Sequence, residues 1–97
     1  MAKFVSLMRF TEQGVKAVQA SPERAEANRA LAAQFGVEVE QILWIMGAYD
    51  ILMILEAPDD ETVGAFLLSM ISRGNVAGQT MRAYEAEEFA ALTSRMA

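Results

Sequence analysis

The sequence contains no cysteine and no histidine. The absence of cysteine excludes disulfide bonds, thiolate nucleophiles and thiolate metal ligands. The absence of histidine removes the side chain that most often serves as a metal ligand and as a general base near neutral pH. Neither a metal site nor a cofactor is therefore predicted, and no known catalytic or nucleotide-binding motif is present, so the catalytic residues of any activity stay unassigned.

Basic residues are also scarce, since 8 lysines and arginines stand against 13 acidic residues and give a net charge of -5. The basic residues are scattered rather than clustered, which argues against binding to nucleic acid phosphates. No run approaches the roughly 20 apolar residues of a membrane-spanning helix, and the N-terminal segment lacks the pattern of a signal peptide. We therefore expect a cytoplasmic protein that binds neither nucleic acid nor membrane.

The length of 97 residues predicts a single domain over residues 1–97. Hydrophobic residues make up 54% of the chain and charged residues 22%, which is slightly on the apolar side of an ordinary globular protein. A domain this small has little interior in which to bury the excess. Part of the apolar surface is therefore expected to contact another subunit.

Four segments are predicted as strands. Residues 3–10 and 49–57, and the second half of residues 37–46, carry apolar side chains on both faces, as strands covered on both sides do. Residues 76–84 are more polar, which favours an edge strand. Gly47 and Ala48 are interpreted as a two-residue hairpin turn, which would set Trp44 opposite Ile51.

Local signals indicate where the helices begin and end. Thr11 and Ser21 are predicted as N-caps of a helix that breaks and restarts before Pro22, and Asp59 as the N-cap of a later helix. A helix between Pro22 and Gly36 is expected to expose Arg24 on a solvated side. The next helix has one apolar stripe, and a short helical tail follows over residues 85–96; the stripe comprises Val63, Phe66, Leu67, Met70 and Ile71.

Gly14 lies in the first turn of a predicted helix, where it costs about 1 kcal/mol relative to alanine. Simple tolerance near a helix end is the favoured explanation, and close approach of another group to the backbone is the alternative. Charges in two strands also suggest a pairing. If the strands were parallel neighbours, Lys3 would lie by Asp50 and Arg9 by Glu56 on one face.

The element order β-α-β-β-α-β predicts an α+β fold of the ferredoxin-like type, a sandwich of one four-stranded antiparallel sheet with helices on one face, followed by a C-terminal helix. Three of the strands are nevertheless apolar on both faces. The second sheet face is therefore expected to pack on another subunit, in a homodimer or higher homo-oligomer of the dimeric α/β barrel type.

Several motifs resemble those of the GYD domain family, which is named for a Gly-Tyr-Asp signature at the hairpin. They are FTEQG at 10–14, SPERA at 21–25, EAPDDE at 56–61, GNV at 74–76 and EEF at 87–89. The signature itself reads Gly47-Ala48-Tyr49-Asp50, with one residue inserted. The family is similar in fold to the dimeric α/β barrel superfamily, and the resemblance implies this fold without assigning a biochemical role.

Three functions remain open: a module that oligomerises and binds a small molecule, a cofactor-independent monooxygenase by analogy with barrel relatives, and a purely structural subunit. A ligand would bind between helices and sheet or at the dimer interface. Proton transfer in an enzyme would fall to Asp50 or Glu56. The ligand-binding candidates are polar residues and one aromatic expected to face such a cavity: Arg9, Thr11, Gln13, Trp44, Tyr49, Asp50, Thr80 and Arg82.

Overall fold

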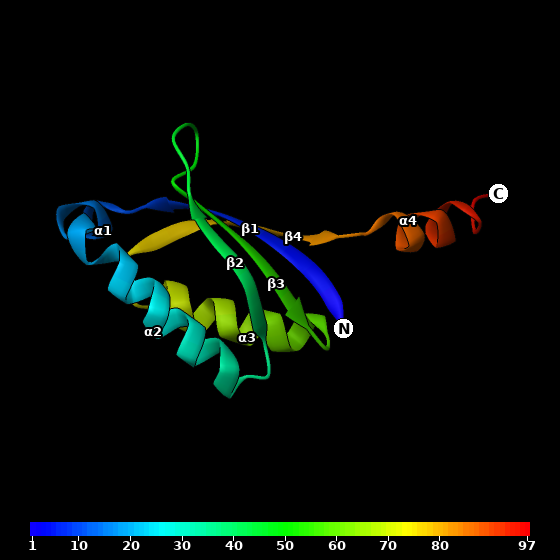
Figure 1. Cartoon of the computed structure of the whole chain (residues 1–97), viewed down its shortest axis with the longest axis horizontal. Helices are drawn as coiled ribbons and strands as arrows, with labels where there is room; N and C mark the ends of the chain where they lie inside the picture. The colour runs from blue at the N-terminus through cyan, green and yellow to red at the C-terminus, as the bar shows by residue number, and fades with distance from the viewer.

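A computed structural model describes all residues, Met1–Ala97, and confirms the predicted α+β fold and element order (Figure 1). The elements are β1 (Ala2–Phe10), α1 (Glu12–Lys16), a 3-10 helix η1 (Val18–Ala20), α2 (Ser21–Gln34), β2 (Glu38–Trp44), β3 (Ile51–Ala57), α3 (Asp60–Ile71), β4 (Val76–Ala83) and α4 (Ala86–Thr93). None of the helices has the length and apolar character needed to cross a bilayer.

The four strands form one antiparallel sheet in the order β2-β3-β1-β4. β1 is central and β4 lies at an edge, as predicted. The parallel pairing proposed for the first and third strands is wrong, because β1 and β3 are antiparallel and Lys3 lies opposite Glu56. The hairpin places β3 between β2 and β1, and β3 is antiparallel to both strands.

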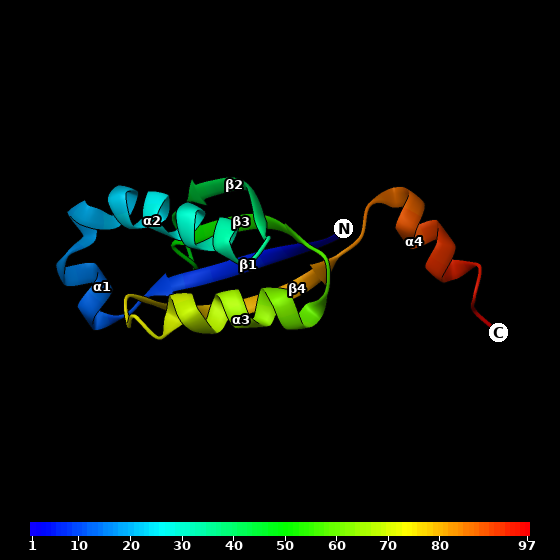
Figure 2. The same cartoon turned by 90° about the horizontal axis from the view of Figure 1, so that it is seen from below.

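Helices α2 and α3 lie side by side on one face of the sheet (Figure 2). The core lies between these helices and the sheet, and its central side chains Leu55 and Phe66 are completely buried. The apolar stripe predicted for α3 is confirmed, because Val63, Phe66 and Met70 are buried in this core. No helix covers the opposite face of the sheet.

The helix ends follow the predicted local signals with one exception. The Thr11 hydroxyl accepts from the N–H of Gly14 at 3.1 Å, and the Asp59 carboxylate accepts from the N–H of Thr62 at 2.8 Å. Ser21 is not a cap, because it is already the first residue of α2 and the preceding residue makes no side-chain capping bond. Its buried hydroxyl instead accepts a hydrogen bond from a tryptophan in β2.

Gly14 is required by close packing, so the explanation by simple tolerance is wrong. A Cβ atom at this position would lie 1.9 Å from the carbonyl oxygen of Asn75. That oxygen also accepts a hydrogen bond from the backbone N–H of Thr11 at 3.1 Å. The first turn of α1 is therefore pressed directly against the loop that joins α3 to β4.

The hairpin register is confirmed, since Trp44 pairs with Ile51. The strands are shorter than predicted, however, and residues 45–50 form a loop, named here the hairpin loop, that rises from the end of the sheet (Figure 1). Within it, the N–H of Ile45 donates to the carbonyl of Asp50 at 2.8 Å.

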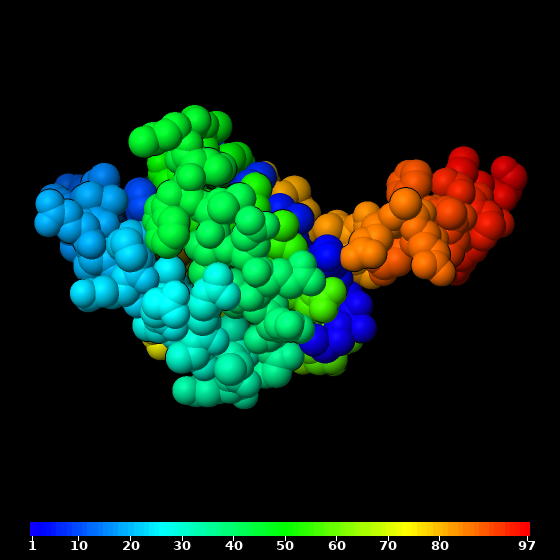
Figure 3. Space-filling model, viewed as in Figure 1, coloured from blue at the N-terminus to red at the C-terminus, as the bar shows by residue number.

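The last helix does not pack on the body of the domain. Residues 84–97, named here the C-terminal arm, extend away from the sheet and contribute to a long dimension of 50 Å against 30 and 18 Å (Figure 3). Two ion pairs fix its base: Lys3 with Glu85 at 2.9 Å and Arg82 with Glu88 at 3.0 Å. Its apolar residue Phe89 remains 59% exposed.

Candidate functional site

Five of the eight predicted ligand-binding residues gather where β1 ends, next to the hairpin loop. They are Arg9, Thr11, Gln13, Tyr49 and Asp50. The guanidinium group of Arg9 lies over the ring of Tyr49, 4.6 Å from its centroid, and its Nε atom donates to the carbonyl of Ala48 at 2.7 Å. The side chain of Arg9 therefore holds the hairpin loop against β1.

Asp50 and Tyr49 also form hydrogen bonds with other residues of the sheet. The Asp50 carboxylate accepts from the N–H of Phe10 at 2.9 Å, and the Asp50 N–H donates to the carbonyl of Met8 at 2.9 Å. The Tyr49 hydroxyl accepts from the amide of Gln79 in β4 at 2.8 Å. Asp50 therefore extends the sheet pairing beyond the strand end and takes part in no ion pair.

Thr11 and Gln13 bind the loop between α3 and β4. The Thr11 hydroxyl donates to the carbonyl of Gly74. The Gln13 amide donates to the carbonyl of Arg73 at 2.9 Å and to the side-chain oxygen of Asn75 at 3.0 Å. These bonds fix the conformation of the loop relative to α1.

A shallow groove of about 420 Å³ runs along this end of the sheet. Arg9, Thr11 and Tyr49 line it together with residues of β4. The remaining candidates lie elsewhere. Thr80 bonds to the hydroxyl of Ser6 at 3.0 Å in the middle of the sheet, and Trp44 donates to α2, so no single cavity contains all eight residues.

Arg82 lies at the far end of β4, at the base of the C-terminal arm. Its guanidinium group stacks over the ring of Tyr84 at 4.5 Å and pairs with the carboxylate of Glu88. The backbone N–H of Glu85, together with Arg82, holds the pKa of Glu88 below its ordinary value. This cluster fixes the direction in which the arm leaves the sheet.

The same end of the sheet carries a concentration of acidic groups around one lysine. Lys3 pairs with Glu85 at 2.9 Å and with Glu40 at 3.2 Å, and these bonds raise the pKa of Lys3. A hydrogen bond with Glu40 raises the pKa of Glu56, and burial and the charge of Glu40 act in the same direction. No group of three or more acidic side chains is arranged to hold a metal ion.

The uncovered side of the sheet is apolar at its centre. Side chains that alternate with the core residues along the strands form this surface, named here the open sheet face: Val5, Leu7, Leu43, Leu52, Ile54 and Met81. Leu43 is 43% exposed and Met81 40%. Six adjacent apolar side chains on one surface of a small domain are typical of an interaction site.

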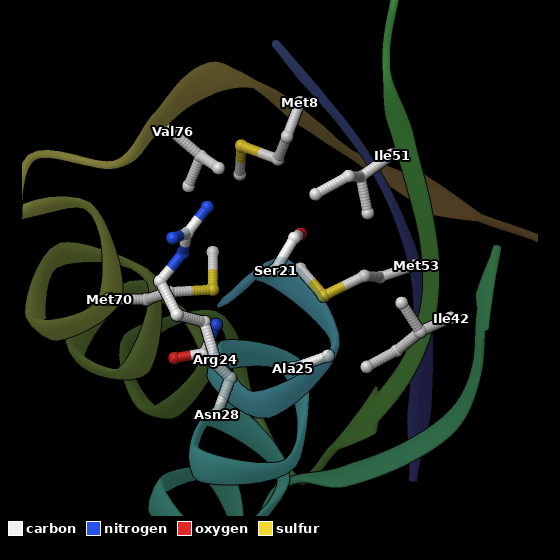
Figure 4. A pocket seen from close by; sticks show the side chains of 10 residues that line it. All are labelled: Met8, Ser21, Arg24, Ala25, Asn28, Ile42, Ile51, Met53, Met70 and Val76. Atoms are coloured by element: carbon white, nitrogen blue, oxygen red, sulfur yellow. The ribbon is translucent and has the colours of Figure 1, made fainter. Parts of the chain in front are cut away.

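A small cavity between α2 and the sheet was not predicted from the sequence. Its volume is about 30 Å³, enough for a water-sized group, and three methionine side chains from β1, β3 and α3 line it (Figure 4). None of the eight predicted residues lines this cavity. It borders an outer groove of about 260 Å³ that contains two arginines, Arg24 and Arg73. No linear motif connects these residues, because Arg24 lies in α2 and Arg73 in the loop that follows α3.

Comparison with known proteins gives a consistent match over most of the chain. A sequence profile described as the GYD domain matches residues 4–93. A protein of Thermus thermophilus, named glutamine synthetase and cystathionine beta-lyase binding protein, is 36% identical over 84 residues, which are 86% of this chain and 88% of that protein.

Among solved structures, a homoserine dehydrogenase from Thiobacillus denitrificans is similar in fold, with a TM-score of 0.56 and 17% sequence identity. The match covers 84% of this chain and 16% of the dehydrogenase, so the chain spans only a small part of that enzyme's length. At this identity the likeness is one of fold alone.

Proposed function

The chain belongs to the GYD domain family, and we propose that it is a protein-binding module that pairs with a second copy of itself and docks onto an enzyme of amino-acid metabolism. One observation carries the proposal: a relative that aligns over most of both chains is named for binding glutamine synthetase and cystathionine β-lyase. These two enzymes are accordingly the first candidate partners.

Self-pairing is assigned to the open sheet face. Its apolar centre is flanked by the basic side chain of Arg9 at one end. At the other end Lys3 lies opposite Glu56 and pairs with Glu40 and Glu85, so that acidic groups outnumber the lysine there. A two-fold axis parallel to the sheet and perpendicular to its strands would bring the Arg9 end of one protomer over the Glu56 end of its partner. Burial of apolar area and complementary charge both favour this arrangement.

Enzyme docking is assigned to the C-terminal arm. Helix α4 stands clear of the body and leaves Phe89 59% and Leu92 38% exposed (Figure 3). An amphipathic helix with an unburied apolar side suits a hydrophobic groove on a partner protein.

Light scattering coupled to size-exclusion chromatography tests the self-pairing. We expect the protein to be a dimer and the Met81→Asp variant to be a monomer, because the carboxylate would be buried in an apolar interface. Leu68→Asp is the matched control, since Leu68 is 67% exposed on α3, away from the sheet. A monomeric unmodified protein, or a Met81→Asp variant that stays dimeric, would contradict sheet pairing.

Biolayer interferometry with purified glutamine synthetase and cystathionine β-lyase of the same organism tests the docking. We expect saturable binding of at least one enzyme. Phe89→Asp should weaken it at least tenfold, since burying one large aromatic side chain contributes about 1.5–3 kcal/mol. Met46→Asp is the control, because Met46 is fully exposed in the hairpin loop. Failure of the unmodified protein to bind either enzyme would refute these two partners.

The alternative of a cofactor-independent monooxygenase stays a prediction. The two carboxylates considered for proton transfer lie at opposite ends of the β3 segment, Asp50 before it and Glu56 near its end. Asp50 accepts a backbone hydrogen bond where β1 ends. No feature of the structure favours an enzymatic role over the protein-binding one.

A further inference from the structure

Two arginines without acidic partners line one groove of this acidic protein. The groove, named here the α2–α3 groove, lies between α2, the end of α3 and the start of β4 and has a volume of about 260 Å³. Its lining includes Arg24, Arg73, Asn28 and Asn75 but no aspartate or glutamate. Neither arginine takes part in an ion pair. In a chain of net charge -5 this local excess of positive charge is not neutralised by the protein.

We propose that the α2–α3 groove binds a small metabolite through an oxyanion, either a carboxylate or a phosphate group. Guanidinium groups recognise both anions through paired N–H donors, and asparagine amides add further donors. The site lies on the helix side of the molecule, apart from the open sheet face and the C-terminal arm. It therefore goes beyond the protein-binding role and does not depend on it.

The side chain of Arg24 is held in place before any ligand arrives. One terminal nitrogen donates to the carbonyl of Ala17 at 2.8 Å, and the other approaches the carbonyl of Gly14 at 3.3 Å. Since a guanidinium group has five N–H donors, three remain for a ligand. An arginine fixed in this way loses little conformational entropy on binding.

Asn75 is oriented by Thr11 and Gln13 at the start of α1. Its side-chain oxygen accepts from Gln13 at 3.0 Å, which leaves the NH₂ group as a donor, and its backbone oxygen accepts from Thr11 at 3.1 Å. The contact with Gly14 packs the backbone at this point. Helix α1 thus positions both Arg24 and Asn75, and the close approach at Gly14 sets the distance between them.

The groove adjoins the small apolar cavity, and this limits the shape of the ligand. Arg24, Asn28, Met70 and Val76 line both spaces. In Figure 4 the side chain of Arg24 extends between those of Met70 and Val76, and Met8 lines the same cavity. The cavity of about 30 Å³ admits a group of about the size of a methyl. The ligand should therefore combine the oxyanion with a short aliphatic group.

Titration of the ¹⁵N-labelled protein by NMR tests the proposal, with inorganic phosphate, acetate and propionate as probes. We expect saturable shifts at the groove residues for at least one probe at millimolar concentration. Tighter binding of phosphate would identify a phosphorylated metabolite, and tighter binding of the carboxylates an organic acid. For a carboxylate, propionate should bind about fourfold more tightly than acetate if its additional methylene is buried. Shifts that do not saturate with any probe would overturn the proposal.

Two variants distinguish binding in the α2–α3 groove from nonspecific attraction of anions to positive charge on the protein. The side chain of Arg73 makes no hydrogen bond or ion pair within the protein, so Arg73→Gln should fold normally. It should weaken binding about tenfold or more, as expected for the loss of a charge-assisted hydrogen bond. Arg95→Gln in the C-terminal arm makes the same change of charge outside the groove and should leave binding unchanged. Equal weakening by both variants would overturn the proposal.

Discussion

Replacement of Gly14 by alanine is expected to destabilise the protein, although alanine is the better helix former. The new Cβ atom would lie 1.9 Å from the carbonyl oxygen of Asn75, whereas Cβ atoms essentially never approach another heavy atom closer than 3.0 Å. The obstacle is backbone, so no side chain can rotate away from it. Either α1 or the α3–β4 loop must move by about 1 Å.

The magnitude follows from what that movement would disturb. Alanine gains about 1 kcal/mol of helix propensity over glycine. Against this, overpacking costs about 1–3 kcal/mol. The hydrogen bonds from Thr11 to the carbonyls of Asn75 and Gly74 are lost or stretched, at about 1 kcal/mol each. The expected net loss is about 2–4 kcal/mol, equivalent to a fall in Tm of about 10–30 °C for a domain of this size.

Urea unfolding followed by circular dichroism measures this loss. Gly64→Ala in α3 is the matched control, since a Cβ atom there would meet nothing within 4 Å. We expect Gly64→Ala to be more stable than the unmodified protein by up to about 1 kcal/mol. A Gly14→Ala variant as stable as the unmodified protein would refute the close approach, and with it the role of α1 in fixing the α3–β4 loop.

Three further predictions concern single side chains. Hydrogen bonds from Thr62 hold the pKa of Asp59 below its ordinary value of 3.8, so the stabilisation by Asp59 is complete above that pH and is lost as pH falls through the lowered pKa. The urea midpoint of the Asp59→Ala variant should be lower than that of the unmodified protein at pH 7, and the two midpoints should converge in acid. A hydrogen bond with Glu40 raises the pKa of Glu56, so the ionisation of Glu56 lowers the stability of the folded protein as pH rises. The Glu56→Gln variant should have a higher urea midpoint than the unmodified protein at pH 7, and the same midpoint well below the ordinary pKa of 4.5. Trp44→Phe removes the hydrogen bond to a buried serine of α2, and thermal unfolding should show a loss of about 1–2 kcal/mol.

Features that depend on neighbouring residues could be predicted from the sequence. Thr11 and Asp59 cap their helices because a hydroxyl or carboxylate there can reach an N–H three residues later. Gly36 follows the end of α2 with a positive φ angle of 75°, which glycine adopts without strain. The apolar stripe of α3 could be predicted from the regular spacing of apolar residues along one helix alone. None of these inferences needed knowledge of the tertiary structure.

The direction of strand pairing could not be determined from the charges. The first strand carries a base near each end, Lys3 and Arg9, and the third strand segment carries an acid near each end, Asp50 and Glu56. Because this pattern is symmetric, parallel and antiparallel pairing both place bases beside acids. The direction is set by the path of the chain through α2 and the hairpin, which a comparison of two strands does not include.

The α2–α3 groove could not be predicted for a different reason. Arg24 was placed on the solvated side of α2 because arginine is normally exposed, yet its guanidinium group reaches back to the carbonyls of Gly14 and Ala17. Those carbonyls are available only because the chain breaks between α1 and α2. Periodicity within one helix gives no information about acceptors in another, and Arg73 joins the groove through the end of α3.

The hairpin signature has a structural explanation that bears on where function lies. The carbonyl of Ala48 accepts from Arg9, the hydroxyl of Tyr49 accepts from Gln79, and the carboxylate of Asp50 accepts from the backbone of β1. Each contact joins the hairpin loop to β1 or β4 at the point where β1 leads into α1. These side chains therefore hold the end of the sheet in shape, and their principal polar groups are already engaged. The open sheet face has apolar side chains without a covering layer, and the α2–α3 groove has an unpaired Arg73 and further N–H donors on Arg24 and Asn75. These are the surfaces on which a ligand or a second protein can gain the most contacts.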